Sequence, residues 1–389
     1  MNEKMKIAYI LPYDWGGMPH YTAELANAVA KYADVTVFGS SGIHLEYFSD
    51  DIKIVKIFDA LDFSMNHLRG MLSLGFLKGL LSYRSIQAVD QLKPDIIHIP
   101  APVIPPLATF IKFYKLDRQY PIIYTKHCLH SQSGLLINIL EHYVLGSFER
   151  LVNFKKIIVH TQHDKSDLAS TIRITDDRIA VVPHGTYTFF KQYPDVQVSK
   201  GINTIIFFGN IREYKGLGCL LQAVPIIQKQ VKNVKIIIAG EGDLSPYQPL
   251  MGACDRSVFE IHNEFVPNDL VASLFQRSTL AVLPYTEMSG MSGVLNVAYA
   301  FGKPVVVSDV GGLNEAVEHG KTGLLVPPRD PQALADAIIR LLKDPELRAM
   351  MGKNVNRKAE ELSWDNIAKK TMDVYEKVIK SEVEQSTSD

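Results

Sequence analysis

The chain has 389 residues, of which 47% are hydrophobic and 21% are charged, and its formal net charge at pH 7 is −1. This length and composition predict two globular domains with large cores, and the near-neutral charge argues against a nucleic-acid-binding protein. Cys128, Cys219 and Cys254 follow no disulfide or metal-ligand spacing, so we expect small buried side chains in a reducing compartment.

The N-terminal segment predicts neither a secretory leader nor a membrane anchor. Its apolar run is short, ends at Asp14 and Gly16, and has no small-residue cleavage site. Nowhere does the sequence hold about 18 consecutive apolar residues, the length that spans a bilayer. We therefore expect a cytoplasmic protein.

Short β-branched apolar runs alternate with helical patterns in two successive series. The first series of predicted strands covers residues 6–11, 35–38, 96–99, 122–124, 157–160 and 179–182, and the second covers 204–208, 234–239, 280–283, 304–307 and 323–326. Near-continuous apolar strands separated by helices are typical of parallel sheets covered on both faces. We predict two similar α/β domains in tandem, an arrangement that places a ligand cleft between them.

The best candidate for a domain boundary is residues 184–203, a loop-like stretch with Pro194 and two glycines. We expect an N-terminal domain over residues 1–190 and a C-terminal domain over residues 200–364. The strongly helical C-terminal region predicts a closing helix over residues 365–380, followed by a disordered polar tail over residues 381–389.

Loops that follow predicted strands carry residues suited to phosphate binding. Gly16 and Gly17 let the backbone approach a ligand closely, although the GxGxxG fingerprint is absent and a tight turn without a ligand is the alternative. Arg212 and Lys215 follow Gly209 at the edge where open α/β sheets bind ligands. These two cations can hold a diphosphate, with solvated surface charges as the alternative.

A third loop, residues 285–293, leads into the most informative stretch of the chain, residues 289–312. Small residues feed directly into an apolar helix, so the backbone N–H groups of Ser292, Gly293 and Val294 are expected to meet a bound phosphate. Taken alone, this stretch also fits an ordinary helix-to-strand unit. Because this loop and the loop at 209–216 belong to one domain, we expect both to hold the same pyrophosphate.

In their order along the chain, these motifs resemble those of the family 4 glycosyltransferases, retaining enzymes of the GT-B fold and of the group 1 type. The resemblance rests on Gly16-Gly17, Thr125-Lys126-His127, Val182-Pro183-His184-Gly185, Gly209 with Lys215-Gly216, residues 239–242, 298–306 and 309–312, and Ser363-Trp364. It covers most of the chain. It implies two Rossmann-like domains with an interdomain cleft and a C-terminal helix that crosses back.

The resemblance also implies roles for individual residues. The catalytic assignments are His127 at the donor sugar, Lys215 and Arg212 at the diphosphate, and Glu287 as the carboxylate available in its loop. The residues expected to bind the donor are Gly16, Gly17, Gly209, Asn210, Gly240, Glu241, Phe265, Val266, Ser289, Gly290, Ser292, Gly293, Val294 and Asn296. Of these, Phe265 and Val266 correspond to the loop that receives the nucleobase.

The chain departs from the family at its paired glutamates, which are usually eight residues apart. Counting back from the Gly-Lys-Pro at 302–304, those positions hold Ser289 and Val297. A one-residue insertion would instead place Glu287 at the first position. Val297 cannot hold a ribose, whereas the neighbouring Asn296 can.

The family's usual Arg after the first glycine of its basic loop is replaced here by Asn210, and we expect Arg212 to supply that charge. The chain has no DxD-like carboxylate pair for a divalent metal, the nearest being Glu241 and Asp243. We therefore expect Lys215, Arg212 and the helix dipole to stabilise the leaving diphosphate without a metal or another cofactor. The pairs His127/His130 and His160/His163 leave a metal site open as a minor alternative.

The predicted function is transfer of a hexose from a nucleoside-diphosphate sugar such as a UDP or GDP sugar, and the resemblance implies that the transfer proceeds with retention. The expected acceptors are glycolipids, polysaccharides or other glycoconjugates, as in polysaccharide biosynthesis, and no nucleic acid is an expected partner. The alternatives are a catalytically weak sugar-nucleotide-binding or scaffold protein and a nucleotide-sugar epimerase of the same fold.

Residues 64–89 hold no acidic residue and carry Arg69, Lys78 and Arg84 among many apolar side chains at helical spacing. Such a basic amphipathic surface can rest on anionic lipid, which predicts a peripheral contact with the cytoplasmic face of a membrane. Burial of this segment against the N-terminal sheet is the alternative.

Overall fold

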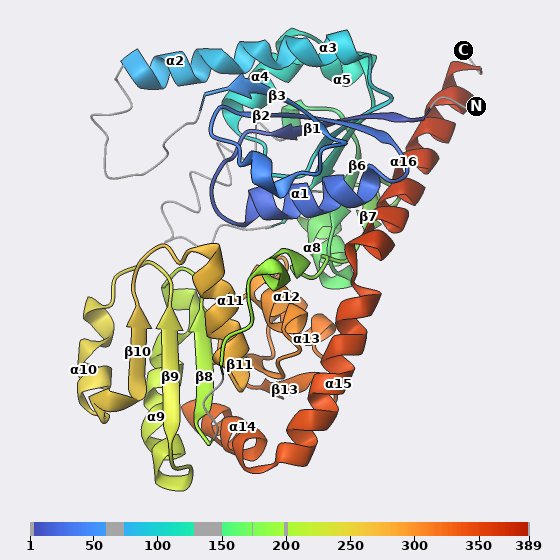
Figure 1. The fold of residues 1–389 in the computed structure, drawn as a ribbon. Coiled ribbons are helices and arrows are strands. Elements are labelled where there is room, and N and C mark those ends of the chain that lie inside the picture. The colour runs from blue at the N-terminus through green and yellow to red at the C-terminus, as the bar shows by residue number, and fades with distance from the viewer. Residues whose placement is uncertain (1–3, 60–73, 128–149, 173, 198–200, 388–389) are drawn as a thin grey trace. The chain divides into compact units, whose positions relative to one another are not determined.

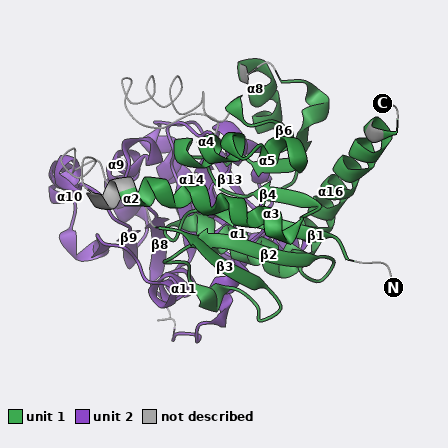
Figure 2. Ribbon diagram, turned by 90° about the horizontal axis from the view of Figure 1, so that it is seen from above, with its two compact units in different colours: residues 1–183, 364–389 green, residues 184–363 purple. Residues whose placement is uncertain are grey.

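The computed structural model describes residues 4–59, 74–127, 150–172, 174–197 and 201–387. The chain divides into two compact units (Figure 2), residues 1–183 with 364–389 and residues 184–363. The second unit therefore begins at residue 184, the first residue of the predicted boundary segment 184–203. The segment 184–197 packs with the second unit, because Tyr187 and Phe190 lie in its apolar core.

In the first unit the described residues form a seven-stranded parallel sheet in the order β3-β2-β1-β4-β5-β6-β7. Its strands are β1 (Lys6–Leu11), β2 (Asp34–Ser40), β3 (Lys53–Phe58), β4 (Ile96–Ile99), β5 (Ile122–Thr125), β6 (Phe154–Val159) and β7 (Ile179–Val181) (Figure 1). Its α-helices are α1 (Gly17–Val29), α2 (Leu74–Ser82), α3 (Val89–Leu92), α4 (Pro105–Phe113), α5 (Leu116–Gln119), α8 (Gln162–Ile172) and α16 (Trp364–Ser386). The strand order reverses at β1, which pairs with β2 on one side and β4 on the other, as in a doubly wound sheet.

In the second unit the described residues form a six-stranded parallel sheet in the order β10-β9-β8-β11-β12-β13. Its strands are β8 (Asn203–Phe208), β9 (Val234–Ala239), β10 (Phe259–His262), β11 (Leu280–Leu283), β12 (Val305–Ser308) and β13 (Gly323–Val326). Its α-helices are α9 (Leu217–Gln230), α10 (Gln248–Gly252), α11 (Asn268–Arg277), α12 (Gly293–Ala300), α13 (Gly311–Ala316), α14 (Pro331–Lys343) and α15 (Pro345–Glu361).

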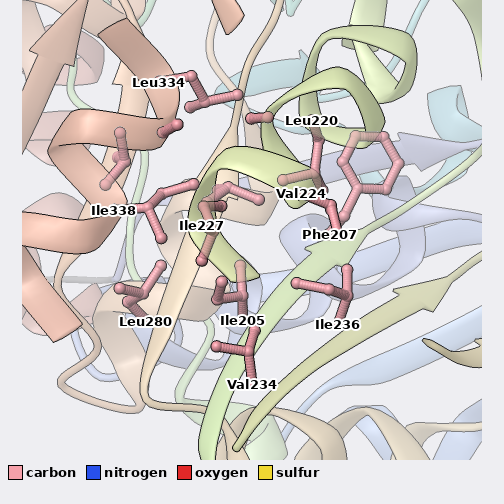
Figure 3. Close-up of a cluster of buried hydrophobic side chains, with 14 of the residues drawn as sticks. Ile205, Phe207, Leu220, Val224, Ile227, Val234, Ile236, Leu280, Leu334 and Ile338 are labelled. Carbon is pink, nitrogen blue, oxygen red and sulfur yellow. The ribbon is translucent and has the colours of Figure 1, made fainter. Parts of the chain in front are cut away.

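Two apolar clusters cover the faces of this second sheet. On one face α9 and α14 pack on β8, β9 and β11 (Figure 3), where the labelled side chains are Ile205, Phe207, Leu220, Val224, Ile227, Val234, Ile236, Leu280, Leu334 and Ile338. On the other face α11 and α12 pack on the same strands. Cys219 and Cys254 are half-buried free thiols beside the first cluster, and Cys128 lies outside the described residues.

Helix α16 is the last element of the chain and belongs to the first unit, where it packs against α1. A buried chain of polar groups joins it to the sheet. Tyr375 Oη lies 2.9 Å from Tyr9 Oη and 2.6 Å from His98 Nδ1, and His98 Nε2 lies 2.8 Å from Thr125 Oγ1. These contacts fix α16 to β1, β4 and β5. Burial lowers the pKa of His98 to about 3, so its imidazole is neutral at pH 7.

The C-terminal residues differ from the expected disordered tail over 381–389. Helix α16 continues through this region to Ser386. An ion pair of 2.7 Å between Lys155 Nζ on β6 and Glu382 Oε1 ties the extension to the sheet. The polar composition of these residues therefore reflects a solvent-exposed helix and not a disordered segment.

The segment proposed to contact lipid lies partly outside the described residues, since its first ten positions, 64–73, are not described. In the remainder Lys78, Leu81 and Arg84 are exposed, while Tyr83 and Ile86 lie in the core of the first unit. This part of the segment is therefore buried on one side, and lipid contact stays a prediction. Across the described ranges, we find no helix with the length and apolar character needed to cross a bilayer.

Candidate functional site

The candidate site of the second unit lies at the carboxyl ends of β8 and β11. The strand order reverses between these neighbours, because α9 follows β8 onto one face of the sheet and α12 follows β11 onto the other. A crevice at such a reversal is the general ligand position in open α/β sheets. The two loops that flank it are residues 209–216 and 284–292.

These two loops are in direct contact. The backbone N–H of Thr286 donates to the carbonyl oxygen of Tyr214 at 2.7 Å. Gly216 has φ of 72°, and a Cβ built on it would lie 1.8 Å from the carbonyl oxygen of Pro284. Only glycine allows this approach, because a side chain would both strain the backbone and collide with the second loop.

The loop after β9 joins the site through a second close approach. Gly240 has φ of 140°, and a Cβ on it would lie 2.3 Å from the carbonyl oxygen of Gly209. The neighbouring Glu241 side chain is exposed, and its carbonyl oxygen accepts from the N–H of Ile211 at 2.8 Å. The predicted glycines 209 and 240 are thus brought together by backbone packing.

Lys215 is the central charge of the site. It is only 9% exposed, and burial lowers the pKa of its ammonium below the ordinary value of 10.5. Its Nζ lies 5.6 Å from the centroid of the Tyr285 ring and against Gly209, where a built Cβ would be 2.6 Å away. Among the described residues no carboxylate or carbonyl oxygen pairs with this Nζ. A buried ammonium in this state favours binding of an anion.

The N-terminus of α12 lies beside Lys215, since the built Cβ of Gly209 would also be 3.3 Å from Val294 Cγ2. Ser292 is the N-cap residue, but its side chain caps no N–H group of the helix and instead lies 3.2 Å from Tyr285 Oη. The N–H groups of Gly293 and Val294 have no hydrogen bond within the described part of the chain. The helix therefore presents unpaired donors next to a cation, which is the chemistry of a phosphate site.

Four predicted polar residues of this unit lie on the same loops with exposed side chains. Arg212 and Asn210 are exposed on the loop after β8, Glu287 on the loop after β11, and Glu241 on the loop after β9. Within the described ranges none of these four forms an ion pair, which leaves them open to a ligand. Ser289 and Gly290 lie on the loop with Glu287.

The residues predicted for the nucleoside lie in different environments. Phe265, after β10, is 71% exposed, whereas Val266 is buried in the core. Asn296 is fully buried on α12, where its Nδ2 donates to the carbonyl oxygen of Ser292 at 3.4 Å. Its Oδ1 has no hydrogen-bond partner among the residues that the structure describes. Val297 lies in the apolar core, which agrees with its exclusion from ribose binding.

In the first unit His127 follows β5 and is almost fully buried. Its Nε2–H donates to the carbonyl oxygen of Pro100 at 2.9 Å, and its Nδ1 lies 3.1 Å from His160 Nε2. His160 Nδ1 in turn lies 2.9 Å from the carbonyl oxygen of Val182, and burial lowers the pKa of His160 to about 4. The Tyr21 ring packs edge-on against His127 at 4.5 Å between centroids. His127 is therefore held in a defined orientation by both ring nitrogens.

Gly16 and Gly17 lie at the start of α1, at the carboxyl end of β1, and both are exposed. Gly16 has φ of 73° and is the N-cap residue of α1, so the predicted glycine turn does require a left-handed backbone. Gly16, Gly17 and His127 belong to the first unit, and the other predicted residues belong to the second.

Tyr285 was not assigned a role from the sequence, and His160 was named there only in the minor metal-site alternative. Each lies at or just beyond the carboxyl end of a strand, beside a predicted residue. Their position at the end of a strand was the feature of the sequence from which a role in the site could have been predicted. The contacts themselves depend on the pairing of strands that are distant along the chain.

Comparison with known proteins finds related sequences across both units. The model for Glycosyltransferase Family 4 matches residues 15–188, and the model for Glycosyl transferases group 1 matches residues 202–344. An uncharacterized glycosyltransferase of Methanocaldococcus jannaschii is 30% identical over 264 residues, 64% of this chain and 65% of the relative. A D-inositol 3-phosphate glycosyltransferase of Pseudarthrobacter chlorophenolicus is 27% identical over 273 residues, 66% of this chain and 64% of the relative. The match thus spans slightly less than two thirds of the length of these curated relatives.

Solved structures share the fold of the chain. Sucrose-phosphate synthase from Thermosynechococcus elongatus matches with a TM-score of 0.74 at 19% identity, covering 97% of this chain and 100% of that one. Anabaena HepE, solved in complex with UDP-glucose, matches with a TM-score of 0.69 at 17% identity, covering 95% of this chain and 100% of that one. With the two parallel sheets, these matches confirm the predicted GT-B fold.

Proposed function

We propose that this chain, which belongs to glycosyltransferase family 4, transfers a hexose from a nucleoside-diphosphate sugar to a glycan or glycolipid acceptor, with retention. The observation that carries the proposal is the buried ammonium of Lys215, which pairs with no carboxylate of the described part of the chain, beside the open N-terminus of α12. The UDP-glucose complex of HepE supports the same class of donor. UDP and GDP sugars are the candidates to test first.

The chemistry of sugar transfer explains why such a site is needed. Negative charge builds on the diphosphate as the sugar leaves, and preorganised donors stabilise that charge. Lys215 supplies a cation and α12 supplies the N–H groups of Gly293 and Val294, while the exposed Arg212 adds a second cation from the same loop. By analogy with oxyanion-hole donors, loss of one such contact raises the barrier by about 3 kcal/mol.

The remaining assignments complete the proposal. His127 contacts the donor sugar, and Phe265 receives the nucleobase. Asn296, whose Oδ1 has no partner within the described ranges, contacts the ribose. Glu287 is the loop carboxylate closest in sequence to the α12 N-terminus. A cytoplasmic location and a peripheral lipid contact through residues 64–89 are part of the proposal.

A ligand panel followed by a turnover assay tests the function. Thermal unfolding is measured with UDP, GDP, ADP and their sugars, because a bound ligand raises the apparent stability by mass action. The donor that stabilises the protein is then incubated with candidate acceptors, and released nucleoside diphosphate is measured. We expect release that depends on both the acceptor and Lys215.

Two results contradict the proposal in different ways. Donor binding without acceptor-dependent release would indicate a sugar-nucleotide-binding protein. No stabilisation by any nucleotide or nucleotide sugar would refute the assignment of the site.

A further inference from the structure

We propose that Tyr285 is the positioning residue of the anion site, because its ring and its hydroxyl each prepare one of the two anion-binding groups. The ring holds the Lys215 ammonium without neutralising it. The hydroxyl holds the Ser292 side chain away from the N–H groups of α12. This inference rests on the proposed function, since the site it describes is the one assigned to the leaving diphosphate.

The contact with the Tyr285 ring stabilises the buried ammonium of Lys215 without adding a negative charge beside it. A buried ammonium is usually paired with a carboxylate, which would cancel the charge that the anion needs. The Tyr285 ring instead presents its negative face 5.6 Å from Lys215 Nζ. Burial raises the pKa of Tyr285 to about 12, so its hydroxyl stays neutral at pH 7 and adds no anionic charge.

The hydroxyl of Tyr285 explains why the side chain of Ser292 does not cap the N-terminus of α12. A serine at the N-cap position ordinarily accepts a hydrogen bond from the second or third N–H of its helix. Ser292 makes no such bond, and its Oγ lies 3.2 Å from Tyr285 Oη instead. The N–H of Val294, the second residue of α12, therefore has no competing acceptor on its own helix.

The position of Tyr285 is itself fixed by packing. Its side chain is 2% exposed in the apolar core shared by α11 and α12. The ring of Tyr214 meets it edge-on, with centroids 6.0 Å apart. A rigid ring that reaches both Lys215 and Ser292 couples the basic loop to the helix start.

Four variants separate the two roles of Tyr285: Tyr285→Phe, Tyr285→Leu, Ser292→Ala and the double variant Tyr285→Phe/Ser292→Ala. Binding of inorganic pyrophosphate and of UDP is measured by calorimetry. We expect Tyr285→Phe to weaken binding about fivefold, because the released Ser292 hydroxyl then caps the helix in competition with the phosphate. Ser292→Ala alone gives the reference affinity for the double variant, because both lack the Ser292 hydroxyl.

The decisive measurement is whether Ser292→Ala restores the affinity that Tyr285→Phe loses. The double variant is expected to regain affinity to within about twofold, because the competing hydroxyl is gone. Tyr285→Leu is expected to bind at least about tenfold more weakly, since the ring contact with Lys215 is also lost. The matched control is Tyr299→Phe, which removes another buried hydroxyl from the same unit, one bonded to Thr322 Oγ1 at 3.0 Å, and should leave affinity unchanged.

The outcomes distinguish this inference from the function on which it rests. Unchanged affinity in Tyr285→Phe, or weak binding that Ser292→Ala does not rescue, would overturn the positioning role while the phosphate site stands. Failure of the unmodified protein to bind either pyrophosphate or UDP would overturn both.

Discussion

Replacement of Lys215 by Met is expected to stabilise the ligand-free protein while removing most of its affinity for pyrophosphate. Lys215 is 9% exposed, and burial lowers its pKa, so its charged form is less stable in the fold than in water. Met has similar length and no charge, and it fills irregular apolar space well. The substitution therefore removes a desolvation cost together with the group that binds the anion.

The size of both effects follows from the contacts of Lys215. Replacement of a buried ion pair by apolar side chains stabilises by up to about 1–4 kcal/mol, and we expect removal of the single buried charge of Lys215 to lie in this range. Loss of the contact with the Tyr285 ring offsets about 0.5–2 kcal/mol of that gain. A net gain of about 1 kcal/mol raises the melting temperature of a unit of this size by about 3 °C. Loss of one charge-assisted hydrogen bond raises the Kd for pyrophosphate about 10- to 100-fold.

Scanning calorimetry without ligand and titration calorimetry with pyrophosphate measure the two quantities independently. The matched control is Lys229→Met, because Lys229 is an exposed lysine on α9 of the same unit and should change neither quantity. A lower melting temperature in Lys215→Met together with an unchanged Kd would refute the reasoning, since it would make Lys215 a structural residue.

Two further predictions concern backbone packing and pH. Gly216→Ala is expected to lower the free energy of unfolding by about 3 kcal/mol in urea denaturation, because its Cβ would lie 1.8 Å from Pro284 O at a φ of 72°. Gly201→Ala is the control, because Gly201 has φ of 80° but no atom of the described residues lies within 4 Å of a built Cβ. It should lower the free energy of unfolding only by the backbone strain, about 1 kcal/mol, and an equal loss in both variants would contradict the argument. Burial lowers the pKa of His98 to about 3 and of His160 to about 4, so the unfolded chain binds more protons below pH 6.5. Stability should therefore fall from pH 6.5 towards pH 4, by up to about 1.4 kcal/mol per pH unit for each histidine, and His98→Gln should flatten this slope in unfolding measured at pH 7, 6 and 5.

The parallel-sheet architecture could be predicted because most strands are buried on both faces. The runs at 6–11, 96–99, 234–239, 280–283 and 323–326 coincide with β1, β4, β9, β11 and β13. Two strands, β3 and β10, are absent from the two predicted series, and both lie at an edge of their sheet. Edge strands are half solvated, so β3 interleaves lysines with its apolar residues and β10 carries a glutamate and a histidine. Their composition lacks the continuous apolar signal of a central strand.

The candidate site could be predicted in part from the sequence. Gly209, Gly216 and Lys215 were found because glycines and a cation directly after a buried parallel strand lie at the edge of the sheet where ligands bind. The role of Tyr285 could not be found in this way, since an aromatic residue after a strand is ordinarily part of a core. Its ring contacts Lys215, which lies on a loop much earlier in the chain, and only the pairing of β8 with β11 brings the two loops together.

The place of α16 in the first unit has a consequence for the order in which the chain matures. Tyr375 supplies the hydroxyl that joins Tyr9 to His98 inside the first sheet, yet it is translated after the whole second unit. A ribosome that has made residues only up to 363 holds a first unit whose central polar groups lack their partner. The N-terminal unit therefore cannot complete this buried polar chain until the C-terminal helix has been synthesised.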